Sequence, residues 1–294
     1  MRKLSKLTAL VLTVVTTMSL LAGCGSSSTS SSAASNGETI PSSEITSDIK
    51  AIKDRGVLRV GVKNAVVGFG YQDTLTGKYS GLEISLAEKI AAYLGVDVEY
   101  TAVTAATRTE LLDSGDIDCV LATFTITDER KKSWDFSTPY FTDHVSVLVE
   151  NSSNIKSFED LKGKTVGVSS GSTSARSLVA AMIDAKQIDG TNYNKDTFDP
   201  ALWNEGVSFK QYDDYPTIST ALSAGEVDAF CVDKSILAIY HTDSRSYISD
   251  EFAPQEYGVA TKKGSTFSPV VDKLINQWLG DGTISSLITE NKLN

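Results

Sequence analysis

Basic residues are in short supply in this sequence. Its 294 residues include 27 Lys and Arg against 37 Asp and Glu, which gives a formal net charge of −10. Proteins that bind nucleic acid or anionic membrane surfaces carry a basic patch that attracts phosphate groups. The acidic balance therefore argues against nucleic acid and against an anionic lipid surface as partners.

Cysteine and histidine are scarcer still. Two of the three cysteines, Cys119 and Cys231, each lie inside an apolar, strand-like run. Two cysteines cannot make a disulfide framework for a chain of this size, so we expect two buried free thiols, with a single bridge as the alternative. The two histidines, His144 and His241, lie in no motif. No spacing of His, Cys or carboxylate residues indicates a metal site, and no cofactor is expected.

Long apolar runs are missing except for one near the N-terminus. Three basic residues precede the run at 7–21, and small residues follow it. This arrangement predicts a secretory signal peptide over residues 1–23, because the run is shorter than the roughly 20 residues that a membrane-spanning helix needs. The tetrapeptide Leu21-Ala-Gly-Cys24 resembles the lipobox of bacterial lipoproteins, which would make Cys24 the lipid-modified first residue of the mature chain. The alternative is an ordinary signal peptide followed by a chance cysteine.

A serine-rich stretch follows Cys24. Residues 25–32 are all Gly, Ser or Thr, a composition typical of flexible tethers. We therefore expect an exported protein, held at the outer face of the bacterial cell membrane by a tether over residues 24–47. Loss of residues 1–23 would remove three positive charges and change the net charge from −10 to −13. The chain after the tether exceeds a typical single domain, so one large or two modest domains are expected.

The rest of the chain alternates strand-like and helical patterns, which predicts an α/β fold with mostly parallel strands. The same order of elements occurs twice. In the first half, strands over residues 58–62, 96–101 and 117–122 alternate with helices that end at Gly95 and Gly115; in the second half, strands over 165–168, 207–212 and 227–232 alternate with helices over 173–185 and 216–224. Gly115-Asp-Ile-Asp118 and Gly225-Glu-Val-Asp228 stand at matching places, and we interpret Asp118 and Asp228 as structural.

This repetition predicts two similar α/β lobes with a ligand cleft between them. The tail adds a predicted strand over residues 257–261 and two helical stretches, which would complete the first lobe. The predicted boundaries are residues 48–144 and 256–294 for lobe 1 and residues 145–255 for lobe 2. The chain would cross between the lobes near residues 142–145 and 251–259, and these two crossings are the candidate hinge.

Several stretches together resemble one family. Gly81-Leu-Glu-Ile-Ser-Leu-Ala87 is similar to a glycine–acidic–aliphatic signature, and Ala122-Thr-Phe-Thr-Ile-Thr-Asp-Glu-Arg130 followed by Asp135-Phe-Ser-Thr-Pro-Tyr140 is the most specific block. Gly171-Ser-Thr173 and Phe230-Cys-Val-Asp-Lys234 complete the pattern. In order and spacing these stretches resemble the polar amino-acid (family 3) substrate-binding proteins of ABC transporters, over about residues 58–262. The resemblance implies a periplasmic-binding-protein-like type II fold with a two-strand hinge, an amino-acid ligand and a transporter permease as partner. Nothing in the sequence demands more than a monomer.

The resemblance also extends to a subgroup. Gly61-Val-Lys63-Asn64, Thr107-Arg108 and Asp214-Tyr-Pro216 are similar to glutamate- and aspartate-binding proteins. The sequence departs from the family pattern at Ser85, where an acidic residue is usual, and near Val66, where many relatives carry an aromatic residue that stacks on the ligand. Residues 186–206 form a longer segment than usual, and we assign no function to it.

A bound amino acid presents a carboxylate and an ammonium group, and both need partners once they leave water. The resemblance assigns the carboxylate to Arg130, whose planar fork matches two oxygens, with help from Thr125. The alternative is a surface arginine in a charged run. Gly171-Ser-Thr173 opens a helix directly after a strand, where backbone N–H groups attract anions. Thr173 is therefore expected to meet the same carboxylate from the second lobe, and Ser172 is the predicted N-cap of the helix; a plain cap is the alternative for this segment.

The resemblance makes Asp233 the partner of the ammonium group, and an ordinary N-cap aspartate is the alternative. Lys63, Arg108 and Tyr215 would then face the ligand side chain, unless Lys63 or Arg108 points to solvent. Together with Arg130 and Asp233 they carry a net charge of +2, which favours an acidic ligand such as glutamate or aspartate over glutamine or another neutral polar amino acid. The complete set expected to bind the ligand is Lys63, Arg108, Thr123, Thr125, Arg130, Ser172, Thr173, Tyr215 and Asp233.

One pattern suggests an enzyme instead. Gly167-Val-Ser169-Ser-Gly171 matches the nucleophile elbow of hydrolases, and the order Asp233 then His241 would suit a catalytic triad. The pattern is short and no histidine lies in a motif, so we expect a binding protein without catalytic residues. Dehydratases and sensor domains on the same fold stay open as alternatives, because a fold alone does not decide function.

Overall fold

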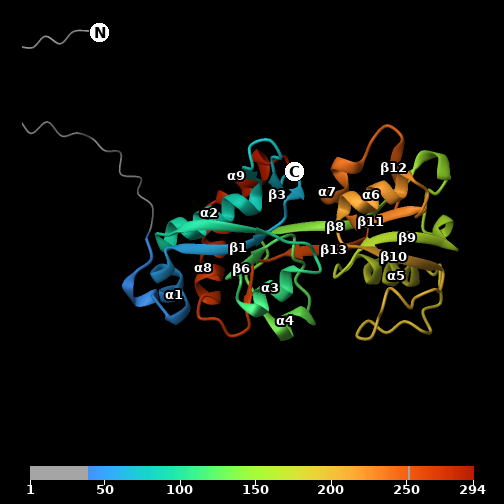
Figure 1. Ribbon diagram of the computed structural model, residues 1–294. Coiled ribbons are helices and arrows are strands. Elements are labelled where there is room, and N and C mark those ends of the chain that lie inside the picture. The colour runs from blue at the N-terminus through green and yellow to red at the C-terminus, as the bar shows by residue number, and fades with distance from the viewer. Residues whose placement is uncertain (1–38, 251) are drawn as a thin grey trace, which may run out of the picture. The chain divides into compact units, whose positions relative to one another are not determined.

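The computed structural model describes residues 39–250 and 252–294. The predicted signal peptide (1–23), the lipid-attachment residue Cys24 and most of the predicted tether lie outside the described residues and stay predictions. Within the described part, the predicted architecture of two α/β lobes is confirmed (Figure 1).

Lobe 1 is built on a sheet with the strand order β5-β1-β6-β14-β7. Strand β1 runs parallel to its neighbours β5 and β6, and β14 runs antiparallel to β6 and β7. The strands are β1 (Val57–Val62), β5 (Asp97–Ala102), β6 (Cys119–Leu121), β7 (Trp134–Phe136) and β14 (Ala260–Lys262), with a small antiparallel sheet of β2 (Ala65–Val66), β3 (Gly70–Gln72) and β4 (Tyr79–Ser80). The helices are α1 (Ser47–Arg55), α2 (Leu82–Leu94), α3 (Arg108–Ser114), α4 (Arg130–Ser133), α8 (Ser268–Gly280) and α9 (Thr283–Glu290). As predicted, α2 and α3 end at Gly95 and Gly115, where φ of 71° and 80° suits glycine.

Lobe 2 has the strand order β10-β9-β11-β8-β12, and β13 also pairs with β8. The strands are β8 (Phe141–Glu150), β9 (Lys164–Ser169), β10 (Val207–Tyr212), β11 (Ala229–Asp233), β12 (Arg245–Tyr247) and β13 (Phe252–Tyr257). The helices are α5 (Ser174–Asp184), α6 (Tyr215–Ser223) and α7 (Lys234–Leu237), with 3-10 turns at Asn151–Ser153, Glu159–Leu161 and Ala238–Tyr240. The N-cap of α5 is Thr173 and not Ser172 as predicted, although the Ser172 hydroxyl still accepts a hydrogen bond from the N–H of Ser174 at 3.4 Å.

The two lobes are joined by a pair of antiparallel strands. β13 pairs with the first half of β8, from Tyr257 opposite Phe141 to Phe252 opposite Val145, and Figure 1 shows the two strands side by side. The predicted hinge at 142–145 and 251–259 lies here, except that residue 251 is outside the described residues. The predicted lobe boundaries at 144/145 and 255/256 fall inside this strand pair.

The predicted single strand over residues 257–261 is wrong. Tyr257 ends β13 in the sheet of lobe 2, whereas Ala260 begins β14 in the sheet of lobe 1. The backbone passes between them at Gly258, where a Cβ atom would lie 2.8 Å from Cδ1 of Ile126. An apolar run of this kind cannot show by itself that the chain changes sheets in its middle.

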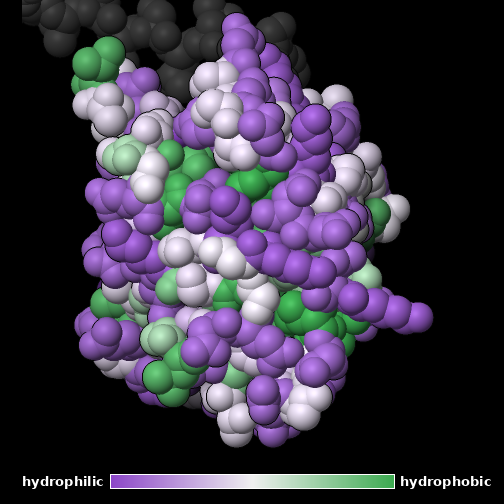
Figure 2. Space-filling model, turned by 90° about the vertical axis from the view of Figure 1, so that its right-hand side faces the viewer, coloured by the Kyte–Doolittle hydropathy of each residue, from purple (hydrophilic) through white to green (hydrophobic). Residues whose placement is uncertain are grey.

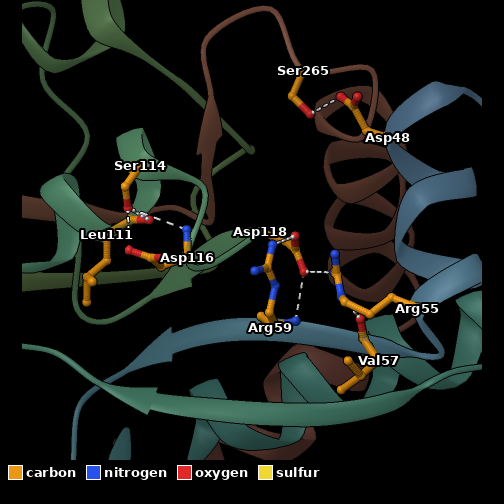
Figure 3. A network of polar contacts seen from close by, with 9 residues as sticks. All are labelled: Asp48, Arg55, Val57, Arg59, Leu111, Ser114, Asp116, Asp118 and Ser265. Carbon is orange, nitrogen blue, oxygen red and sulfur yellow. Dashed lines mark hydrogen bonds and ion pairs between the residues drawn. The ribbon is translucent and has the colours of Figure 1, made fainter.

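The internal repeat has the same hydrogen bonds in both lobes. In lobe 1 the Asp118 N–H donates to Arg59 O at 2.8 Å, and the Asp118 carboxylate accepts the Arg59 N–H at 2.8 Å. In lobe 2 Asp228 makes the same pair of bonds with Thr165, at 2.8 Å each. Asp118 additionally pairs with the guanidinium groups of Arg59 and Arg55 (Figure 3). Both aspartates therefore join a loop to a parallel strand of their lobe, β1 in lobe 1 and β9 in lobe 2, as the structural interpretation predicted.

The folded region begins earlier than predicted. A 3-10 turn spans Ser42–Glu44, inside the segment 24–47 that was expected to be a tether. Glu44 accepts a hydrogen bond from the Tyr93 hydroxyl at 3.0 Å and pairs with Lys273 at 2.7 Å. These contacts attach residues near 44 to lobe 1, so the described part of the predicted tether is folded.

The cores and the surface follow the sequence pattern. Cys119 and Cys231 are both buried and free, as expected, and burial raises the pKa of each thiol. Figure 2 shows one face on which hydrophilic residues dominate and apolar residues form small separate groups. Among the described residues, the large apolar side chains that are exposed are Ile45, Val67, Leu75, Leu202, Ile239 and Leu279. Within the same residues, no helix combines the length and the apolar character needed to cross a bilayer.

Candidate functional site

The predicted ligand-binding residues all lie where strands end and helices begin. In lobe 1, Lys63 follows β1, Arg108 begins α3, Thr123 and Thr125 follow β6, and Arg130 begins α4. In lobe 2, Ser172 and Thr173 lie between β9 and α5, Tyr215 begins α6, and Asp233 ends β11. Ligands of α/β folds bind at such strand ends. All of these residues except Arg130 and Ser172 are buried, although most are polar.

Lys63 and Arg108 do not point to solvent. Arg108 is 2% exposed, and its Nη1 donates to Ala122 O at 2.7 Å and to Thr123 O at 3.2 Å. Its guanidinium carbon lies 3.9 Å from the centroid of the Phe124 ring. Lys63 is 4% exposed, and its Nζ lies 5.2 Å from the centroid of the Tyr215 ring. Since Tyr215 belongs to lobe 2, the Lys63 ammonium lies where the two lobes meet.

Arg130 connects the lobes and is not a solvated surface residue. It is half-buried. Its Nη1 donates to Thr125 O at 2.8 Å in lobe 1, and its Nη2 donates to Gly171 O at 3.0 Å in lobe 2. Its guanidinium carbon lies 4.7 Å from the centroid of the Phe124 ring, on which Arg108 also stacks. The planar fork is thereby held in one orientation beside the segment that precedes α5.

Asp233 is a buried carboxylate next to the strand pair that joins the lobes. It is 5% exposed and accepts a hydrogen bond from the Tyr257 hydroxyl. Burial, reinforced by the charge of Asp143, raises the pKa of Asp233 to about 7, while the Tyr257 hydrogen bond and the charges of Arg108 and Arg130 act in the opposite direction. A cation placed beside this carboxylate would favour its ionised form.

Gln255 on β13 was missed by the sequence analysis. Its side-chain Oε1 accepts hydrogen bonds from the Thr125 hydroxyl at 2.9 Å and from the Thr173 hydroxyl at 2.8 Å. Its Nε2 donates to the carbonyl oxygens of Ala253 and Pro254 at 3.0 and 3.3 Å, which fixes the orientation of the amide. One oxygen of the hinge strand thus bridges the two threonines predicted to meet the ligand carboxylate, so that a carboxylate would have to replace Gln255 as their acceptor.

Glu83 was also missed, although it stands inside the signature Gly81–Ala87. It is fully buried near the start of α2, and its Oε1 accepts hydrogen bonds from the Thr123 N–H and the Tyr140 hydroxyl, at 2.6 Å each. Its charge acts on both Lys63 and Arg108. Lys63, Arg108, Arg130 and Asp233 together have a net charge of +2 when ionised. Adding the ionised Glu83 lowers this net charge to +1. Burial raises the pKa of Glu83, which works against that reduction.

The lobes are in direct contact across the site. Gly171 of lobe 2 has a φ of 73°, and a Cβ atom on it would lie 2.7 Å from Ala105 O of lobe 1. An ion pair of 2.7 Å joins Arg176 to Glu129. Lys63 and Tyr215 line a cavity of about 30 Å³, which is the space of a water molecule or two. This space is too small for an amino acid, so a ligand that lies between Lys63 and Tyr215 requires the lobes to move apart, which is the hinge motion expected of such folds.

The segment 186–206 lies at the edge of the same cleft. Tyr193, Phe198 and Trp203 pack edge to face or tilted against one another, with ring centroids 5.6–6.0 Å apart. Phe198 lines a groove of about 350 Å³ together with Arg130 and Gly171. The packing of these three rings holds together a segment that has no helices or strands, and it places the Phe198 ring at the cleft entrance.

The residues of the hydrolase pattern are engaged elsewhere. Ser169 is 3% exposed and ends β9. Asp233 accepts from Tyr257, and His241 is exposed and stacks on Tyr247 with ring centroids 4.9 Å apart. The structure gives the catalytic alternative no support from these contacts.

Comparison with known proteins identifies the family. Residues 58–290 match the bacterial extracellular solute-binding proteins, family 3. The chain is 33% identical over 260 residues to a glutamine-binding protein of Geobacillus stearothermophilus, covering 86% of this chain and 91% of that protein. It is 29% identical over 259 residues to an L-glutamate/L-aspartate-binding protein of Pseudomonas aeruginosa, covering 83% and 79%. The structure of an ancestral arginine-binding protein bound to arginine superposes with a TM-score of 0.67 at 34% identity, covering 80% of this chain and 98% of that one. This chain therefore belongs to the bacterial extracellular solute-binding proteins, family 3.

Proposed function

We propose that this protein binds a free acidic amino acid, glutamate or aspartate, between its lobes and delivers it to the permease of an ABC importer. The observation that carries the proposal is the burial of two cationic side chains, Lys63 and Arg108, where the lobes meet. The protein would act outside the cytoplasm, held by lipid on Cys24; the mass of the mature N-terminal peptide tests that anchor.

Every amino acid carries an α-carboxylate and an ammonium group, and three residues of the site are candidate partners for these two groups. The fork of Arg130 can take the α-carboxylate, because its two terminal nitrogens already lie between Thr125 of lobe 1 and Gly171 of lobe 2. Thr173 borders the same groove and completes the carboxylate site. Asp233 can take the ammonium group, which would supply the cation that its buried carboxylate requires.

The side-chain end of the site favours a second carboxylate. Burial lowers the pKa of Lys63 well below its usual range, and repulsion from Arg108 lowers it further. A carboxylate between Lys63 and Arg108 would offset one of the two positive charges and would favour the ionised form of Lys63 in a poorly solvated place. The cluster of Lys63, Arg108, Arg130, Asp233 and Glu83 has a net charge of +1 when all are ionised, which a ligand of charge −1 brings to zero.

A neutral ligand such as glutamine is the second candidate. Glu83 reduces the positive charge of the cluster, and the similar protein of Geobacillus stearothermophilus is named for glutamine. A neutral amide would leave the net charge of +1 unchanged but could still donate and accept hydrogen bonds at the side-chain end.

A thermal-shift series with the standard amino acids decides between these candidates. A ligand at about a hundred times its dissociation constant adds roughly 2.7 kcal/mol to the free energy of unfolding, which raises the melting temperature visibly. We expect glutamate or aspartate to give the largest rise. A larger rise with glutamine would reject the acidic ligand, and no rise with any amino acid would reject amino-acid binding.

Binding should weaken as the pH falls below 7. Asp233 must be ionised to pair with the ammonium group, and its pKa of about 7 means that acid leaves a growing fraction of the unliganded protein protonated. The Kd should therefore rise by up to about tenfold for each pH unit below 7. Calorimetric titration between pH 5.5 and 8.5 measures this, with Asp233→Asn as a control that binds weakly and without the pH dependence. A flat profile in the unmodified protein would contradict the role of Asp233.

A further inference from the structure

Glu83 is a fully buried carboxylate of lobe 1 that has so far entered only the charge count of the site, without a contact to the ligand. Its Oε1 accepts two hydrogen bonds of 2.6 Å, from the Thr123 N–H and from the Tyr140 hydroxyl. Its Oε2 is buried and has no hydrogen-bond partner. Buried carboxyl groups are costly, so this one calls for an explanation beyond packing.

The Thr123 N–H and the Ala122 C=O belong to the same peptide group. Glu83 accepts from the N–H at 2.6 Å, and the Arg108 Nη1 donates to the C=O at 2.7 Å. One peptide group is thus held between a carboxylate and a guanidinium. The carboxylate faces the positive end of the peptide dipole and the guanidinium faces the negative end, so that the two hydrogen bonds strengthen each other.

The backbone at this point needs such support. Thr123 has a φ of 45°, a left-handed conformation that costs a residue with a Cβ atom about 1–2 kcal/mol. The same turn presents both acceptors of Arg108, the carbonyl oxygens of Ala122 and Thr123. Arg108 Nε is itself buried without a hydrogen-bond partner, so the guanidinium is oriented but not fully satisfied by the protein. Whatever fixes the Thr123 backbone therefore also fixes the direction of the Arg108 fork.

We propose that Glu83 is a positioning and specificity residue: through the Ala122–Thr123 peptide it orients Arg108, and its negative charge limits how strongly the site prefers an acidic over a neutral ligand. This inference rests on the proposed function, because it assigns Arg108 to the ligand side chain. It explains how a site with three cationic side chains can be tuned by a residue that does not touch the ligand.

Glu83→Gln is the decisive variant. The glutamine carbonyl can still accept from Thr123 and Tyr140, so the shape of the turn is kept while the charge is lost. The ratio of the glutamine Kd to the glutamate Kd, measured by calorimetry on the full protein, should rise about tenfold, which corresponds to about 1.4 kcal/mol. Glu88→Gln is the matched control, because it removes one negative charge from an exposed position of the same helix α2; its ratio should equal that of the unmodified protein.

Glu83→Asp tests the positioning role separately. It also provides the test of the inference if Glu83→Gln does not fold. It keeps the charge but draws the carboxylate away from Thr123, so both Kd values should rise at least fivefold with little change in their ratio. An unchanged ratio in Glu83→Gln, or unchanged Kd values in Glu83→Asp, would overturn the inference while the unmodified protein still binds. If the unmodified protein binds neither amino acid, the proposed function fails instead.

Discussion

Replacing Arg130 with alanine is expected to weaken amino-acid binding by at least about a hundredfold. The variant loses the fork assigned to the α-carboxylate, and removing one partner of a desolvated charge pair typically costs about 3–5 kcal/mol. It also loses the 3.0 Å hydrogen bond to Gly171 O that connects the lobes. Every amino acid carries an α-carboxylate, so all ligands should lose affinity by a similar factor.

Isothermal titration calorimetry with the best ligand of the thermal-shift series measures the loss. Lys131→Ala is the matched control, since Lys131 is exposed, adjacent in α4 and equally positive. Arg130→Lys should lie between the two, because it keeps the charge and loses the planar fork. Affinity within about threefold of the unmodified protein in Arg130→Ala would show that the carboxylate binds elsewhere.

Gly171→Ala is expected to impair closure of the lobes and to weaken binding about 5- to 150-fold. The added Cβ would lie 2.7 Å from Ala105 O and 3.0 Å from Ala106 Cα, and both are backbone atoms that cannot turn aside. Overpacking of this kind costs about 1–3 kcal/mol. The clash exists only while the lobes touch, so the variant should populate the open form, which small-angle scattering detects as a larger radius of gyration in the presence of ligand.

Gly225→Ala separates closure from backbone strain. Gly225 has a φ of 71°, close to the 73° of Gly171, but a Cβ atom on it would meet nothing within 4 Å. Both variants should therefore lose about 1–2 kcal/mol of stability from the left-handed conformation. Only Gly171→Ala should lose affinity. Equal affinities in the two variants would contradict closure over Gly171.

Much of the fold could be read from the sequence because the signals are local. Gly95 and Gly115 end helices where the apolar periodicity stops, and the matching Asp118 and Asp228 make the same bonds in both lobes. The passage of the chain from one sheet to the other at Gly258 could not be read in this way. It depends on the pairing of β13 with β8 in one sheet and of β14 with β6 in the other, and the run itself carries no sign of these long-range pairings.

The site residues also divide into those that the local sequence reveals and those that it does not. Arg108, Arg130 and Asp233 stand in recognisable motifs, and the structure brings them close enough for their charges to interact. Gln255 stands in no motif, and its partners Thr173 and Thr125 lie 82 and 130 residues away along the chain. Glu83 stood in a motif, but its effect on Arg108 depends on a peptide group that belongs to neither residue. Roles that act through a third group are the ones that sequence reasoning omitted.

The direct bonds between the lobes have a consequence for the transport cycle. Arg130 to Gly171, Arg176 to Glu129 and Thr125 to Gln255 join protein atoms of the two lobes directly. Bonds between protein atoms of the two lobes lower the free energy of the closed form, so a ligand shifts an equilibrium that already exists. A permease that recognised only the closed shape would then hydrolyse ATP for a binding protein without ligand. Each additional bond between the lobes would increase this hydrolysis without transport.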